Sequence, residues 1–221
     1  MRAAIYLVVT AVSLFAGCRG THAPTSNDTN RATHAGPADV PNLLGQGRSF
    51  FGIALGDGAK NVVFVIDRSG SMTCTIDYVK FELKRSIREL DEADEFHVVF
   101  YSSGPPLEMP TRRLVNATEW NKQLAFEFVD GIFAQGETDP SKALEQAFAV
   151  GPELIYLLTD GEFDRSVVNL VKRLNADKCV MVHTIGFLYR TGEEVLKKIA
   201  EQNGGTYRFV AEADLAHMFP P

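Results

Sequence analysis

Short apolar runs alternate along the chain with longer stretches of helical periodicity, and this alternation limits the possible folds most. The runs are rich in β-branched residues and mostly apolar, which is typical of strands that are buried on both faces of a sheet. They are Val62 to Ile66, Phe96 to Tyr101, Leu154 to Leu158 and Val180 to Ile185. A chain of 221 residues with this pattern is long enough for one substantial core, so we expect a single α/β domain.

Between these runs, apolar residues recur every three or four positions, which places them along one side of a helix. Such series run from Ile76 to Leu90, from Val167 to Leu174 and from Val195 to Ala200. Asp139 and Pro140 are expected to open a further helix through Phe148, as N-cap and first-turn residue, and Asp164 to cap the helix that follows it.

Alternating strands and helices predict a mostly parallel sheet with helices on both faces. Two shorter pieces are expected to extend it. The stretch from Arg113 to Ala117, ahead of a helix at Trp120, is a candidate short antiparallel edge strand, and Thr206 to Val210 a last strand.

The first 18 residues have the features of an export signal. Arg2 precedes an apolar run from Ala3 to Ala16, which is shorter than the roughly 20 residues of a membrane-spanning helix. The ending Leu14-Phe15-Ala16-Gly17-Cys18 resembles a bacterial lipobox, although Phe15 stands where an aliphatic residue is usual. This resemblance implies an exported lipoprotein of the cell envelope, anchored in the membrane through lipid on Cys18, or a secreted protein if Cys18 is not acylated.

The segment of residues 19–45 is polar and contains Thr, Asn, Pro and Gly with few large apolar residues, so we expect a flexible tether. Residues 46–221 form the predicted domain, with its core in 61–210. The piece from Ser49 to Leu55 is expected to be an edge strand or a strap against the domain.

Oxygen-bearing side chains gather where two of the buried strands end. The first strand runs into Asp67-Arg68-Ser69-Gly70-Ser71, and the third into Thr159-Asp160-Gly161. A loop with Gly136-Glu137-Thr138-Asp139 lies between them in sequence. Ligands of open α/β sheets bind at the carboxyl ends of strands, so these three segments meet if the two strands are neighbours.

Hydroxyl and carboxylate oxygens are hard ligands that suit Mg²⁺ best here, with Mn²⁺ or Ca²⁺ as alternatives. Ser69, Ser71 and Thr138 would bind the ion directly, and Asp67 and Asp160 would hold its waters. Because the direct ligands are neutral, the ion would stay electrophilic and would favour a carboxylate from outside the domain.

The Asp67-Arg68-Ser69-Gly70-Ser71 turn, Thr138 and Asp160-Gly161 resemble the complete metal-ion-dependent adhesion site of von Willebrand factor type A domains. The resemblance covers about Asn61 to Val210. It implies a doubly wound six-stranded sheet with one antiparallel edge strand, and an adhesion or scaffold module that binds a protein partner through the partner's Asp or Glu. Glu137 departs from bacterial members, which often have glycine there, and it could crowd or occupy the open metal position.

Other functions have less support. The net charge of −6 argues against nucleic-acid binding, and there is no phosphate-binding glycine motif for a nucleotide. A metal-assisted hydrolase or phosphotransfer enzyme at the same site is the alternative. His97 and His183 lie inside predicted strands, however, and Ser69 stands where a phosphoaspartate motif needs a second acid. We therefore expect no enzymatic activity.

Cys74 follows the carboxyl edge of the sheet, whereas Cys179 lies at the opposite edge, roughly 20 Å away for a six-residue strand. A disulfide requires α-carbons within roughly 7 Å. We expect no bridge between them.

Overall fold

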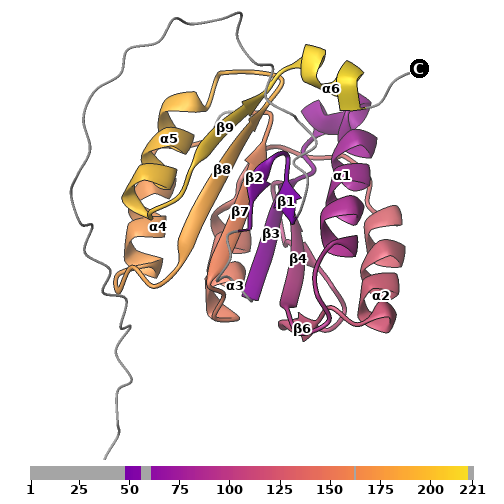
Figure 1. Cartoon of the computed structure of the whole chain (residues 1–221). Coiled ribbons are helices and arrows are strands. Elements are labelled where there is room, and N and C mark those ends of the chain that lie inside the picture. Colours follow the sequence, from indigo (N-terminus) through magenta and orange to yellow (C-terminus); the bar gives the residue numbers. More distant parts are fainter. Residues whose placement is uncertain (1–47, 56–60, 162, 219–221) are drawn as a thin grey trace, which may run out of the picture. The chain divides into compact units, whose positions relative to one another are not determined.

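The computed structural model describes residues 48–55, 61–161 and 163–218 (Figure 1). The predicted export signal, Cys18 and the predicted tether lie outside these ranges, so their predictions stay untested. Within the described ranges, no helix combines the length and the apolar character needed to cross a membrane.

The central sheet has seven strands in the described part of the chain, in the order β5-β4-β3-β7-β8-β9, with β6 also pairing with β4. Five of them run parallel to one another. These are β3 (Asn61–Asp67), β4 (Glu95–Tyr101), β7 (Leu154–Thr159), β8 (Met181–Phe187) and β9 (Tyr207–Val210). The predicted fold class, a mostly parallel doubly wound sheet, is confirmed.

The edge beside β4 differs in detail from the expected single antiparallel strand. Both β5 (Leu107–Glu108) and β6 (Val115–Asn116) pair antiparallel with β4. The sheet therefore has seven strands and not six. Two residues are too short to show an alternating pattern, and β5 forms only because Leu107 and Glu108 pair with a distant strand.

Helices cover both faces of the sheet (Figure 1). α1 (Ile76–Arg88) and α2 (Glu119–Asp130) pack on one face, and α3 (Ser141–Ala149), α4 (Ser166–Leu174) and α5 (Glu193–Gln202) on the other. A further helix that the sequence pattern did not predict, α6 (Glu212–Met218), adds Leu215 to the core on the α1 side.

The predicted helix starts are nearly right. Asp139 Oδ1 accepts a 3.0 Å hydrogen bond from Ser141 N, and Asp164 Oδ1 accepts one of 2.7 Å from Ser166 N. Each aspartate thus accepts a hydrogen bond from the first amide of the helix that follows, but it lies one position before the N-cap, which is Pro140 for α3 and Arg165 for α4. α3 itself begins at Ser141, so Pro140 is at the N-cap position and not in the first turn.

The continuous apolar runs follow from burial on two sides. Along β3, Phe64 and Ile66 contribute to the core under α1 and α2, whereas Val63 and Val65 contribute to the core under α3 and α4. Successive side chains of a strand point to opposite faces, so a strand between two helical layers needs apolar residues at every position.

A separate hairpin of β1 (Ser49–Phe50) and β2 (Ile53–Ala54) packs beside α1 (Figure 1). Phe50 is fully buried and its ring meets those of Phe64 and Tyr156 edge-on. The segment is therefore a strap on the domain, as one of the two expectations had it, and not a strand of the central sheet.

Candidate metal centre

The two site carboxylates follow adjacent strands. β3 and β7 are paired in parallel, with Ile66 opposite Leu158, so Asp67 and Asp160 both emerge at the carboxyl edge of the sheet. This confirms the predicted neighbourhood of the two strands. It places the candidate site where open α/β sheets bind ligands.

Asp67 is fully buried and held by hydrogen bonds on both oxygens. Ser69 N donates to Asp67 Oδ1 at 2.7 Å, and Thr159 Oγ1 donates to Asp67 Oδ2 at 2.6 Å. The first bond folds the chain into a tight turn that leads into a 3₁₀ helix, η1 (Gly70–Cys74), and then α1. Thr159 was missed in the sequence because a β-branched residue at a strand end looks like one more strand residue.

A chain of hydrogen bonds joins the remaining oxygens. Ser69 Oγ and Ser71 Oγ lie 3.0 Å apart, and Ser71 Oγ donates to Asp160 Oδ1 at 2.7 Å. The other carboxylate oxygen, Asp160 Oδ2, is buried without a hydrogen-bond partner. A buried polar atom of this kind is costly unless a water or an ion satisfies it, so it indicates a ligand.

The loop that carries Thr138 lies against both turns. Gly70 N donates to Gly136 O at 2.8 Å, which ties the loop to the serine-bearing turn. A Cβ atom built on Gly161 would lie 3.2 Å from Thr138 Oγ1, so this hydroxyl is beside the β7 turn. The loop thus brings the third predicted hydroxyl beside the turn that carries Asp160.

Glu137 is fixed through its backbone and has an exposed side chain. Ser103 N donates to Glu137 O at 2.6 Å, and Glu137 N donates to Ser103 Oγ at 2.9 Å. These bonds set the loop that precedes Thr138. Glu162, the next acidic residue after the β7 turn, lies outside the described residues.

Burial disfavours the ionised form of both site carboxylates. It raises the pKa of Asp67 to about 6, against the opposing effect of the hydrogen bonds from Thr159 and Ser69. Burial also raises the pKa of Asp160, against the hydrogen bond from Ser71. A divalent cation between them would stabilise both charged forms, since an opposite charge favours ionisation.

The donors fit a hard cation. The site offers two carboxylates and three hydroxyls, and no thiolate or imidazole belongs to it. Among residues 48–55, 61–161 and 163–218, no three His, Cys, Asp or Glu side chains converge as a metal-binding group. Hydroxyl and carboxylate oxygens suit an ion that keeps several waters, as Mg²⁺ does, better than they suit zinc, which favours His and Cys ligands.

The two core histidines are engaged elsewhere, as predicted. Buried His97 pairs through Nε2 with Glu108 Oε2 at 3.2 Å. His183 Nδ1 accepts a 2.8 Å hydrogen bond from Thr206 N. Burial lowers the pKa of both imidazoles. Neither contacts the serines or the threonine of the candidate site.

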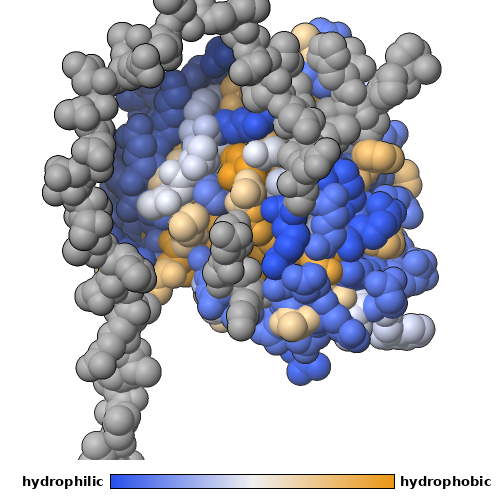
Figure 2. All heavy atoms as spheres, viewed as in Figure 1, coloured by the Kyte–Doolittle hydropathy of each residue, from blue (hydrophilic) through white to orange (hydrophobic). Residues whose placement is uncertain are grey.

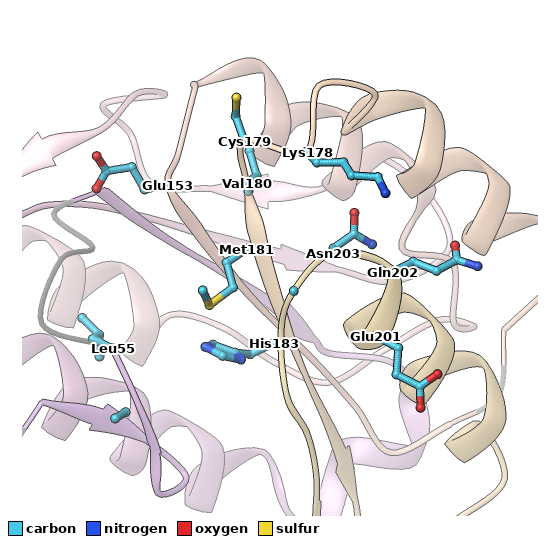
Figure 3. A pocket seen from close by; sticks show the side chains of 12 residues that line it. Leu55, Glu153, Lys178, Cys179, Val180, Met181, His183, Glu201, Gln202 and Asn203 are labelled. Atoms are coloured by element: carbon cyan, nitrogen blue, oxygen red, sulfur yellow. The ribbon is translucent and has the colours of Figure 1, made fainter. Parts of the chain in front are cut away.

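A cavity of about 770 Å³ lies at the opposite edge, near the amino ends of β7 and β8. Figure 3 shows Met181 and His183 of β8 pointing into it, toward Leu55 of the strap. Figure 2 shows apolar surface there, beside the hairpin, whereas the surface over α1 and α2 is mostly hydrophilic. The cavity is thus separate from the oxygen-rich edge.

Cys74 and Cys179 are both exposed and do not form a disulfide, as expected.

Comparison with known proteins agrees with this architecture. Residues 60–209 match the family model described as von Willebrand factor type A domain. The inter-alpha-trypsin inhibitor heavy chain H4 of Homo sapiens is 31% identical over 173 residues, which cover 69% of this chain and 18% of that protein. Protein YwmC of Bacillus subtilis is 30% identical over 171 residues, which cover 66% of this chain and 75% of that protein. The chain spans about a fifth of the length of the heavy-chain relatives.

Solved structures show the same fold. A von Willebrand factor type A protein from Catenulispora acidiphila superimposes with a TM-score of 0.63 at 24% identity, over 72% of this chain and 41% of that one. The pilus adhesin SpaC of Lactobacillus rhamnosus GG gives 0.58 at 16% identity, over 72% and 29%.

Proposed function

Because the chain belongs to the von Willebrand factor type A family, whose domains are generally protein-interaction and adhesion modules, we propose that it is a divalent-metal-dependent protein-binding module. Ser69, Ser71 and Thr138 would hold the ion directly. Asp67 and Asp160 would hold it through waters and balance its charge. The bound ion supplies a Lewis-acidic position for a carboxylate of the partner protein.

One observation carries the proposal: buried Asp160 Oδ2 lacks a hydrogen-bond partner beside three hydroxyls and a second buried carboxylate. This cluster has acceptors in excess of donors. A cation with its waters supplies what is missing, because it neutralises charge and its waters donate hydrogen bonds.

Metal would act as a switch for an acidic partner. Exposed Glu137, Asp139 and Asp164 lie in the loops that follow or precede the site residues. Without the ion, these charges and the two buried carboxylates repel an approaching Asp or Glu. With the ion in place, the local charge favours it.

We also propose that the protein is located at the cell envelope. The lipobox-like sequence suggests that the domain is held at the cell envelope by lipid on Cys18, with residues 19–45 as its tether. Cys18→Ala is expected to release the domain from membrane fractions or to stall its processing. Undiminished membrane retention of a processed Cys18→Ala protein would contradict the anchor.

A hydrolase or phosphotransfer enzyme has less support. Nucleophilic catalysis by Ser69 or Ser71 requires an adjacent base. In the described ranges, these hydroxyls hydrogen-bond each other and the carboxylates of Asp67 and Asp160, which the proposal assigns to the waters of the ion, and both core histidines are engaged elsewhere. We therefore propose a binding protein and not an enzyme.

The test is capture of a partner from envelope extract by the purified full-length protein. Wild type and Asp67→Ala are compared in Mg²⁺ and in chelator, after circular dichroism has shown that both are folded. We expect capture only by wild type in Mg²⁺. Asp177→Asn is the matched control, since Asp177 is an exposed carboxylate at the opposite edge of the sheet. Equal capture in all conditions would rule out the metal bridge.

A further inference from the structure

Two aromatic side chains near the candidate metal centre are exposed although nearly all other large apolar residues around it are buried. Phe133 is 73% exposed and Tyr189 is 58% exposed. Rings this exposed add little to the core, and exposed apolar groups gathered at a site are typical of protein-binding surfaces.

Tyr189 lies one strand away from Asp160. In the β7–β8 pairing Thr159 is opposite Gly186, so Asp160 is level with Phe187, and neighbouring strands are about 4.8 Å apart. Tyr189 follows two residues later. It therefore belongs to the same edge of the sheet as the candidate ion site, on the β8 side.

The turn that presents Tyr189 is strained. Tyr189 N donates a 2.7 Å hydrogen bond to Phe187 O, and Leu188 between them has a φ of 62°. This three-residue turn is rare for a residue other than glycine and costs free energy. Leu188 N also donates to Val210 O at 2.8 Å, which fixes the turn to β9.

Phe133 lies on the other side of the site, in the loop between α2 and Thr138. Arg68, which stands between Asp67 and Ser69, holds this loop at two points. Arg68 Nη1 donates to Phe133 O at 3.1 Å, and Gln135 N donates to Arg68 O at 2.7 Å. The ring is thus presented by backbone that is bonded directly to the metal-site turn.

The cations nearest to the two rings are already engaged. Lys80 Nζ lies 5.6 Å from the centre of the Phe133 ring and 3.8 Å from Asp77 Oδ1. Arg190, next to Tyr189, is stacked over the ring of Phe209 and paired with Glu193. The two rings therefore offer apolar surface, and the acidic residue of the partner is assigned to the ion.

We infer that Phe133 and Tyr189 select a protein segment in which the metal-bound Asp or Glu is flanked on both sides by apolar side chains. This inference rests on the proposed function, because it assigns the partner's carboxylate to the ion between the rings. A purely polar segment would leave both rings in water. A segment with apolar flanks would cover them and gain affinity from that burial.

The experiment uses a displayed library of disulfide-constrained peptides with a fixed central Asp and random flanking positions. The library is selected on the full-length protein in Mg²⁺, and clones are kept only if chelator releases them. For wild type we expect enrichment of aromatic and large aliphatic residues on both sides of the Asp. Phe133→Ser and Tyr189→Ser should each lower the affinity of the enriched peptides at least about tenfold.

The variants also show which claim fails. Both should bind Mg²⁺ as wild type does, since neither position is one of the five site residues. Trp120→Ser is the matched control. Trp120 is 72% exposed, but it lies in the first turn of α2, at the end of that helix away from Phe133. Metal-released clones with random flanks, or unchanged affinity in both ring variants, would overturn this inference alone. No metal-released clones at all would overturn the proposed function and this inference with it.

Discussion

Ser71 Oγ donates a 2.7 Å hydrogen bond to Asp160 Oδ1 and so joins the turn after β3 to the turn after β7. A serine hydroxyl that donates its only proton keeps its lone pairs available. The contact therefore holds Ser71 in the orientation in which it can still act as a ligand. The protein's own hydrogen bonds thus hold the two turns of the candidate site together.

The buried carboxyl of Asp67 should reduce the stability of the metal-free protein at neutral pH. Its pKa rises from 3.8 to about 6 on folding, so the folded state resists ionisation. The penalty is absent below pH 3.8, grows between pH 3.8 and 6, and is constant above that at roughly 3 kcal/mol. Asp67→Asn should thus be more stable than wild type at pH 7 in chelator.

Urea unfolding of both proteins in chelator, at pH 7 and pH 5, measures this difference. We expect the advantage of Asp67→Asn to fall to about half between pH 7 and pH 5, because the wild-type carboxyl is then mostly protonated in the folded state. An advantage that grows as the pH falls, or a variant less stable at pH 7, would contradict the assigned burial penalty.

Gly161 should be needed for the position of the Thr138 hydroxyl. An added Cβ would lie 3.2 Å from Thr138 Oγ1, which is tighter than ordinary contact, so Gly161→Ala should displace that hydroxyl. We expect divalent-ion affinity to fall several-fold with a stability change of less than about 1 kcal/mol. Gly131→Ala is the control, because its Cβ would meet its nearest neighbour at 3.5 Å. Equal ion affinity in both variants, measured by calorimetric titration, would contradict this role.

The strap should depend on one buried carboxylate in α1. Glu82 Oε1 accepts a 2.8 Å hydrogen bond from Phe51 N, and Glu82 is paired with Arg85, which also donates to Ser49 O at 3.0 Å. Glu82→Ala would leave the partly buried Arg85 guanidinium and the buried Phe51 amide without this acceptor. We expect a loss of about 3–5 kcal/mol in the free energy of unfolding.

Glu89→Ala provides the comparison, because Glu89 also pairs with Arg85 but its side chain is more exposed. Its loss should cost less than about 1 kcal/mol. Denaturant titration of the two variants should separate them clearly, and similar losses would show that the strap does not rely on Glu82.

The sequence pattern was sufficient for the elements whose side chains are buried by their own periodicity. The strand through Val62 to Ile66 and the helix from Ile76 were placed to within two residues, because burial on two faces or on one stripe is visible locally. β5 and α6 were missed because short elements form through contacts with distant residues. Strand ends also predicted that Asp67 and Asp160 lie together.

Finer features of the site depend on which distant atoms meet. The bond from Thr159 to Asp67 and the clamp from Arg68 to the Phe133 loop join segments far apart in sequence. Neither residue type is distinctive at its position. Only the folded chain shows that they support the site and its rim.

The most direct test of the account is a titration of the full-length protein with Mn²⁺, followed by electron paramagnetic resonance of the free ion. Wild type should bind a single Mn²⁺ ion that Mg²⁺ displaces, Asp177→Asn should bind it equally, and Asp67→Ala, once shown to be folded, should bind it at least about tenfold more weakly. Equal Mn²⁺ binding by wild type and Asp67→Ala, or none by wild type, would contradict a metal centre at the carboxyl edge of β3 and β7.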